Sequence, residues 1–267
     1  MDLSDLVAQM QKLGYKPDDA RAKICQDIVL KAISKSVLST NVTIKGGVVM
    51  RNMTDNIRRA TQDMDIDFIR YSLSDEAIVC FIEKINCIDG IKIKKVGKIE
   101  ELSQQDYNGK RVYIHITDSK GELIESKIDL GVHKHLEIEQ ETYCFDISFD
   151  DKGVSLMANS REQMFAEKLR SLLKFGIFST RYKDIYDMYY QCGKMNEEKL
   201  LHCIQTYIYD DTGMRENDIN AIIKRVEFIF HNKNYKQRVD MSDKRWLDDN
   251  IDVIFDGIIK YLRGIQG

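Results

Sequence analysis

The sequence predicts an α+β fold in which a mixed β-sheet with flanking helices precedes a helical C-terminal part. Alternating segments of strand length lie in the first 158 residues, whereas a capping signature at Ser160 opens an apolar spacing typical of helices. The chain has a single proline and no linker rich in Ser, Pro or Gly. We therefore expect a boundary in a short turn, between an α/β core over residues 1–158 and a helical domain over residues 159–267.

Local periodicity predicts the elements of the α/β core in order. Residues 18–38 have helical spacing, residues 41–45 alternate as a short strand that ends at Gly46 and Gly47, and residues 48–53 resume a helix. After an acidic strand over residues 63–68, we expect a helix over residues 74–86, strands over 91–98, 111–117 and 123–130, and a hairpin turn over 118–121.

The helical domain is expected to begin with a capping box. Ser160 and Gln163 have the spacing of that motif and precede an apolar-periodic run, and Thr180 is a candidate cap for the next helix. Further helical spacing is found over residues 196–209, 216–231 and 244–263.

Composition is that of an ordinary globular protein, with 43% hydrophobic and 31% charged residues. No segment approaches the about 18 uninterrupted apolar residues that span a membrane. The N-terminal segment is amphipathic and acidic, without the basic-then-apolar order of a secretory signal. We therefore expect a cytoplasmic protein with no membrane partner.

Charge and cysteine content exclude two classes of site. A net charge of −3 excludes a uniformly basic nucleic-acid-binding surface, although 40 Lys and Arg residues allow a local basic cleft. The six cysteines never form the close pairs that zinc or redox sites need. We expect them to be buried free thiols.

The most informative segment is a short run of alternating acids. Asp63, Asp65 and Asp67 occupy every second position, with apolar residues between them. On a β-strand this spacing places the three carboxylates on one face. Carboxylates about 7 Å apart repel each other by about 2 kcal/mol at an intermediate dielectric, and a divalent cation relieves that repulsion. Oxygen ligands of this kind suit Mg²⁺, which predicts metal-assisted phosphate chemistry.

Gly46 and Gly47 lie between a strand and a helix, where the missing Cβ atoms let phosphate oxygens approach backbone N–H groups. A glycine pair alone more often marks a tight turn. The acidic strand that follows makes the prediction of a phosphate site more specific. Four cations lie nearby, and we expect at least two of them on the solvated surface. They are Lys45, Arg51, Arg58 and Arg59.

A later strand supplies a candidate third carboxylate. Ile128 and Leu130 are expected to face the core, which places Lys127 and Asp129 on the opposite face. Acids on two neighbouring strands form the oxygen-rich clamp used in metal-assisted phosphoryl transfer. A single acid at the end of a strand would not by itself indicate a metal site.

Lys168 falls inside the apolar arc of its predicted helix. A charge there must reach the surface, form an ion pair or bind a ligand, because an unpaired buried ammonium is costly. The next helix carries Lys183, Asp184 and Asp187 on one side. Without further context we expect that side to be solvated, with Lys183 and Asp187 as an i,i+4 pair.

These motifs together resemble the AbiEii/AbiGii abortive-infection toxin family of nucleotidyltransferase-like proteins in the polymerase-β superfamily. Members act as toxins in bacterial toxin–antitoxin and phage-defence pairs. The resemblance covers about residues 20–195 and rests on the order and spacing of Lys45–Gly47, Arg51, Thr61–Asp65, Lys127–Asp129, Glu167–Leu169 and Arg181–Asp187.

The resemblance implies a mixed-sheet nucleotidyltransferase core and assigns roles to named residues. The nucleotide would be held by the glycine turn with its flanking cations, Lys45, Gly46, Gly47, Arg51 and Arg59. The acids Asp63, Asp65 and Asp129 would bind Mg²⁺. Lys168 and Asp184 would support catalysis. Asp67 extends the acidic face and is expected to be only a surface carboxylate. Residues 196–267 match no motif of the family and would bind the acceptor or an antitoxin.

The implied function is a toxin that transfers a nucleoside monophosphate from an NTP to a macromolecular acceptor, with tRNA as that acceptor. One alternative is protein nucleotidylation, in which a Ser, Thr or Tyr hydroxyl is the acceptor. A second alternative is a non-catalytic nucleotide- or partner-binding module, against which the complete set of acids argues.

Overall fold

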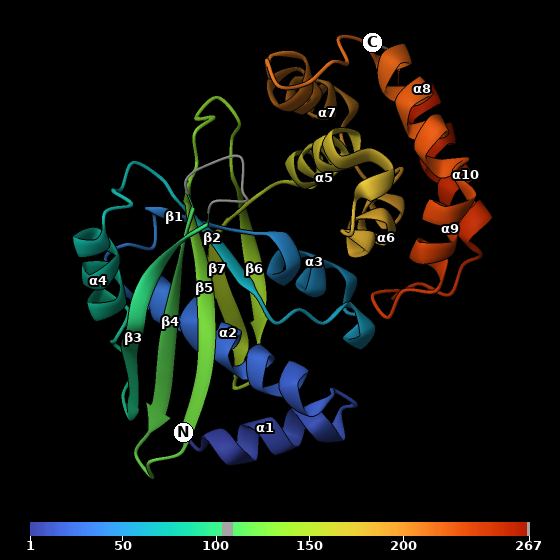
Figure 1. Cartoon of the computed structure of the whole chain (residues 1–267). Coiled ribbons are helices and arrows are strands. Elements are labelled where there is room, and N and C mark those ends of the chain that lie inside the picture. Colours follow the sequence, from blue (N-terminus) through green and yellow to red (C-terminus); the bar gives the residue numbers. More distant parts are fainter. Residues whose placement is uncertain (103–108, 266–267) are drawn as a thin grey trace. The chain divides into compact units, whose positions relative to one another are not determined.

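A mixed seven-stranded sheet forms the centre of the N-terminal part of the chain (Figure 1). Its strands lie in the order β3-β4-β5-β2-β1-β7-β6, and β2 is antiparallel to β1 but parallel to β5. Their bounds are β1 Val42–Lys45, β2 Met64–Phe68, β3 Ile91–Leu102, β4 Gly109–Asp118, β5 Leu123–Val132, β6 Glu141–Ile147 and β7 Asp150–Ala158.

The computed structural model describes residues 1–102 and 109–265. The chain forms two compact units, Met1–Asn159 and Ser160–Gly267. That each unit is a domain in its own right stays a prediction.

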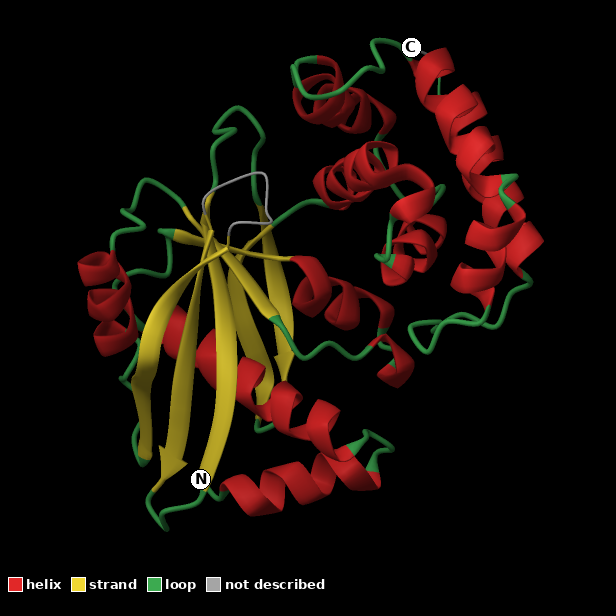
Figure 2. Cartoon of the chain, in the orientation of Figure 1, coloured by secondary structure: helices red, strands yellow, loops and turns green. Residues whose placement is uncertain are grey.

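Helices cover the apolar face of the sheet. Helix α2, Pro17–Lys35, packs against β5, β6 and β7, and it crosses behind the sheet in the view of Figure 2. Ile66 and Leu130 are register partners on that face and are buried. The remaining helices of this unit are α1 Leu3–Lys12, α3 Gly46–Thr54, a 3₁₀ turn Ile57–Arg59, and α4 Asp75–Lys84, which packs against β3.

The second unit is entirely helical in the part that the structure describes. Its elements are α5 Arg161–Phe175, a 3₁₀ turn Gly176–Phe178, α6 Tyr182–Gln191, α7 Glu197–Ile204, a π turn Gln205–Tyr209, α8 Ile219–Phe230, α9 Lys233–Asp240 and α10 Ile251–Gly264. Trp246, Tyr186 and Tyr235 are among its largest fully buried side chains. The predicted α+β fold class is therefore confirmed.

Several local expectations differ from the structure. Ser160 caps α5 as predicted, with its Oγ 3.1 Å from the Gln163 N–H, but Thr180 does not cap α6, which begins after Arg181 without a side-chain cap. Helices α8 and α10 begin later than expected because Asp218 and Asn250 cap them. Strands β6 and β7 and helix α9 have no counterpart among the predicted elements. Within residues 1–102 and 109–265, no helix is both long enough and apolar enough to cross a membrane.

Candidate active site

The polar face of the sheet carries a row of four charged residues. In the strand register Asp65 lies between Lys45 of β1 and Asp129 of β5, and Asp129 in turn lies beside Arg111 of β4. Register partners in a sheet point their side chains to the same face. The structure therefore brings Asp65 and Asp129 side by side, as the acid spacing predicts.

Asp129 is held by an arginine that was not among the predicted site residues. Arg111 donates from Nε to Oδ1 at 2.7 Å and from Nη2 to Oδ2 at 2.8 Å. These hydrogen bonds raise the pKa of Arg111 above its ordinary value, against the opposing effect of burial. Counting outward from the predicted turn at residues 118–121 pairs Arg111 with Ile128, one position short of Asp129, because the connection between Thr117 and Leu123 holds one more residue than the predicted turn.

Asp63 lies one residue before β2, at the solvent edge of the row. Its Oδ1 is 2.8 Å from Nζ of Lys127, and the Asp63 side chain is 51% exposed. Such an exposed pair contributes little stability and exchanges readily with solvent. Asp63 is therefore the most accessible of the three predicted metal ligands.

The glycine turn touches the acids directly. Gly46 has φ +64°, and a Cβ built there would lie 2.4 Å from Oδ2 of Asp65. A Cβ on Gly47 would lie 2.5 Å from Oγ1 of Thr61, just before the acidic strand. Glycine at these two positions lets the turn approach Asp65 and Thr61 more closely than any residue with a Cβ could.

The acid set suits a Mg²⁺ ion held mainly by two carboxylates. Among the described residues, no group of three or more His, Cys, Asp or Glu is arranged to hold a metal. Arg111 engages both oxygens of Asp129, and Lys127 engages Oδ1 of Asp63. Mg²⁺ is usually bound by one or two protein carboxylates, with water and phosphate completing its shell.

Three of the four cations near the turn are buried, so the expectation of at least two on the surface is wrong. Lys45 pairs with Asp67 at 2.8 Å, and both side chains are nearly inaccessible. Asp67 is thus not a surface carboxylate. Arg58 is exposed, whereas Arg59 is buried at the end of the 3₁₀ turn.

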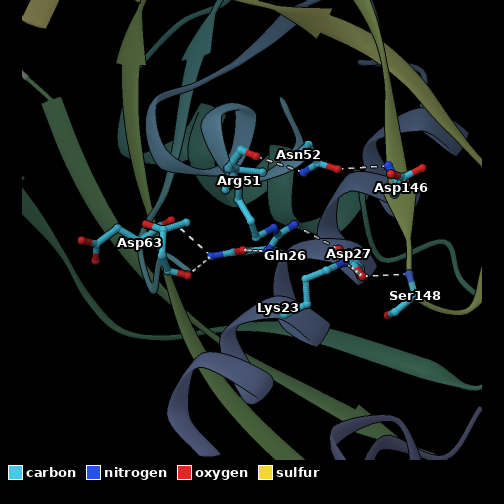
Figure 3. A network of polar contacts seen from close by, with 10 residues as sticks. Lys23, Gln26, Asp27, Arg51, Asn52, Asp63, Asp146 and Ser148 are labelled. Atoms are coloured by element: carbon cyan, nitrogen blue, oxygen red, sulfur yellow. Dashed lines mark hydrogen bonds and ion pairs between the residues drawn. The ribbon is translucent and has the colours of Figure 1, made fainter. Parts of the chain in front are cut away.

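Arg51 points into a buried network on α2 (Figure 3). It donates to Oε1 of Gln26 and lies 3.4 Å from Oδ1 of Asp27. Desolvation lowers the pKa of Arg51, and the neighbouring Asp27 opposes that effect. The structure places the side chain of Arg51 among core polar groups, although the resemblance implies that it binds nucleotide.

The second unit contains a buried cluster around Lys168. Its Nζ is 2.9 Å from Oδ1 of Asp184 and 3.0 Å from Oδ2 of Asp187. Lys168 therefore does not reach the surface, and the acidic side of α6 is not solvated. Burial alone would raise the pKa of Asp184, but Lys168 and Arg181 outweigh burial and hold that pKa at about 2.

Trp246 completes this cluster and was not predicted from the sequence. The indole Nε1 donates to Oδ1 of Asp187 at 3.1 Å, and the side chain is almost fully buried. The partners are 59 positions apart, so no local pattern connects them. The segment between α9 and α10 is thereby tied to α6.

Comparisons with known proteins identify the family of the chain. The family described as nucleotidyl transferase AbiEii toxin, type IV TA system, matches residues 28–250. A crystal structure of an antigenic nucleotidyltransferase-like protein from Paracoccidioides brasiliensis is similar at 12% identity and a TM-score of 0.41, covering 82% of this chain and 91% of that chain. At that score the likeness by itself establishes neither fold nor activity. No curated protein matches the chain significantly.

The family match includes the glycine turn, all the acids of the sheet and the Lys168 cluster. It extends past residue 195 into the helical unit, beyond the segments that carry the resemblance. The chain belongs to the AbiEii nucleotidyl transferase toxin family of type IV toxin–antitoxin systems.

Proposed function

We propose that the protein is a cytoplasmic toxin that transfers a nucleoside monophosphate from an NTP to a macromolecular acceptor, with tRNA as that acceptor. The observation that carries the proposal is the contact of Gly46 with Asp65, which in turn lies beside Asp129. The glycine turn at the start of α3 is proposed to bind phosphate beside this acidic pair.

The proposed reaction is a single displacement at the α-phosphorus. The acceptor hydroxyl oxygen forms a bond to that phosphorus while the bond to the bridging oxygen breaks, and pyrophosphate leaves. Mg²⁺, when bound, would neutralise charge on the triphosphate and on the leaving group. Asp63 and Asp65 would hold it, and N–H groups at the start of α3 would bind phosphate oxygens.

Asp129 is proposed to complete the acid set in one of two ways. It joins the metal ligands when Arg111 turns to the triphosphate, or it accepts the proton of the acceptor hydroxyl. Lys45 and Arg59 are proposed to orient the nucleotide beside the turn. Arg111 is well suited to phosphate, because its planar guanidinium binds two oxygens at once.

Lys168 and Asp184 are proposed to support the reaction from the helical unit. Lys168 and Arg181 face two carboxylates, Asp184 and Asp187, so the cluster is electrically balanced. Asp184 would hold Lys168 in its ionised form, which is the supporting role that we propose for this pair. The family description also leads us to propose a cognate antitoxin as partner.

One labelling experiment distinguishes this function from its alternatives. Purified protein is incubated with each α-labelled NTP, Mg²⁺ and either total tRNA or cell lysate. We expect the label in tRNA and none with Asp65→Asn. Label in protein would favour protein nucleotidylation. If cells were poisoned equally by the native protein and by Asp63→Ala and Asp65→Ala variants, the non-catalytic module would be the better account.

A further inference from the structure

We propose that Gln26 is a positioning residue that holds the Asp63-bearing segment in place, and that Arg51 acts through Gln26 instead of contacting nucleotide. This inference rests on the proposed role of Asp63 in binding metal and NTP. The residues concerned lie on α2 and α3, in the first unit of the chain.

Gln26 binds the backbone on both sides of Gln62. Its Nε2 donates to the carbonyl of Thr61 at 2.9 Å and to the carbonyl of Asp63 at 3.2 Å. The carboxylate of Asp63 is engaged elsewhere, with Lys127. One side-chain amide therefore fixes the main chain of the segment and leaves the Asp63 carboxylate at the solvent edge.

Arg51 determines which end of the Gln26 amide faces the segment. An amide presents either its NH₂ or its oxygen to a neighbour, and only the NH₂ can donate to two carbonyls. Arg51 donates from Nη1 to Oε1 of Gln26, which orients the NH₂ toward Thr61 and Asp63 (Figure 3). Gln26 is 1% exposed and Arg51 is 4% exposed, so water does not replace either partner.

Asp27 anchors the arginine from its other side. Its Oδ1 lies 3.4 Å from Nη2 of Arg51, and its Oδ2 accepts from the Ser148 N–H at 2.9 Å and from Lys23. The connection thus runs from the turn between β6 and β7 through Asp27, Arg51 and Gln26 to the segment before β2. Each side-chain member is buried and hydrogen-bonded, which makes the network rigid.

Two substitutions separate positioning from folding. Gln26→Glu keeps an acceptor for Arg51 but removes the donor to the two carbonyls, and it introduces a carboxylate beside the Arg51 guanidinium in the core. Gln26→Met keeps the approximate length and removes every hydrogen bond. Asn41→Leu is the matched control, because Asn41 donates to the carbonyl of Ile69 at 3.2 Å, just past the opposite end of β2.

Two measurements are made on the full-length variants. Calorimetric titration gives the dissociation constant for Mg²⁺–NTP, and hydrogen exchange gives the protection of residues 60–64. We expect Gln26→Glu and Gln26→Met to weaken nucleotide binding by about tenfold or more and to speed exchange in residues 60–64. We expect Asn41→Leu to change the dissociation constant by less than about twofold.

A double variant tests the role of Arg51. If Arg51 acts through Gln26, then Arg51→Met adds little to the binding loss already caused by Gln26→Met. Additive losses would show instead that Arg51 contacts nucleotide directly. Native binding and native exchange in both Gln26 variants would overturn the positioning role. If the native protein binds no NTP, the proposed function fails, while the exchange rates still decide whether Gln26 holds the segment.

Discussion

At the residue scale, the backbone at Gly46 is specialised in two ways at once. Its φ of +64° disfavours any residue with a Cβ, and the position of that Cβ is taken by the Asp65 carboxylate. Gly97 has φ +63° but nothing within 4 Å of its Cβ position. Substitution at Gly97 would therefore cause backbone strain alone, whereas substitution at Gly46 would cause the same strain and also a contact with Asp65.

Alanine at these positions gives a matched pair of variants. Both changes cost about 1–2 kcal/mol of backbone strain, and we expect Gly46→Ala to lose at least as much unfolding free energy as Gly97→Ala because its Cβ also meets Asp65. Only Gly46→Ala displaces Asp65, and we expect it to weaken Mg²⁺–NTP binding by at least about tenfold in calorimetry. Equal nucleotide affinity in the two variants would mean that the Gly46 contact is irrelevant to binding.

Asp184 makes the stability of the helical unit depend on acidity. Its pKa is lowered from 3.8 to about 2, which corresponds to about 2 kcal/mol of stabilisation. A lowered pKa in the folded state means that this stabilisation is complete above about pH 4 and is lost as the pH falls toward about 2.

We therefore expect the native protein to lose up to about 2 kcal/mol more unfolding free energy than Asp184→Asn over that pH interval. Urea titrations followed by Trp246 fluorescence measure the difference, since this tryptophan is the only one in the chain. Parallel pH curves for the two proteins would contradict the assigned role of Asp184 in the cluster.

At the element scale, α6 and α10 pack too closely for a side chain at Gly257. A Cβ there would lie 2.5 Å from Cε2 of Tyr189, whereas Gly264 at the end of the same helix has nothing within 4 Å. Alanine favours a helix over glycine by up to about 1 kcal/mol, so Gly264→Ala should be neutral or stabilising. We expect Gly257→Ala to destabilise by about 1–3 kcal/mol through overpacking.

Thermal and urea unfolding monitored at Trp246 compare the two α10 variants. The sign of the change in unfolding free energy decides the result. Helix propensity stabilises both variants, whereas the steric contact with Tyr189 destabilises only Gly257→Ala. A stabilised Gly257→Ala would show that α6 and α10 adjust without cost.

The elements that the sequence predicted are those whose signals are local. The acidic strand, its antiparallel partner and the capped start of α5 all follow from alternation or capping within a few residues. Strand β7 begins with Asp150, Asp151, Lys152 and Gly153, which obscure its alternation. Gln26 and Trp246 form hydrogen bonds with residues far away in the sequence, so local periodicity cannot predict these contacts.

At the scale of the whole molecule, we expect two unfolding transitions because the chain forms two compact units. Trp246 lies in the second unit, so its fluorescence reports on Ser160–Gly267. Ile66→Ala creates a cavity in the sheet core, at a typical cost of about 2–5 kcal/mol. We expect Ile66→Ala to lower the unfolding midpoint of the β-strands, as measured by hydrogen exchange. The unfolding midpoint measured by Trp246 fluorescence should stay unchanged. A common shift of both midpoints would show that the chain unfolds as one cooperative domain.

The salt bridges of the sheet lessen the repulsion among its acids without a bound cation. Lys127, Lys45 and Arg111 accompany Asp63, Asp67 and Asp129, so electrostatic crowding is relieved before any cation arrives. A chelator should therefore leave the melting temperature of the purified toxin almost unchanged. Under the proposed function, a freshly synthesised chain would fold under magnesium starvation and gain activity once the metal returns.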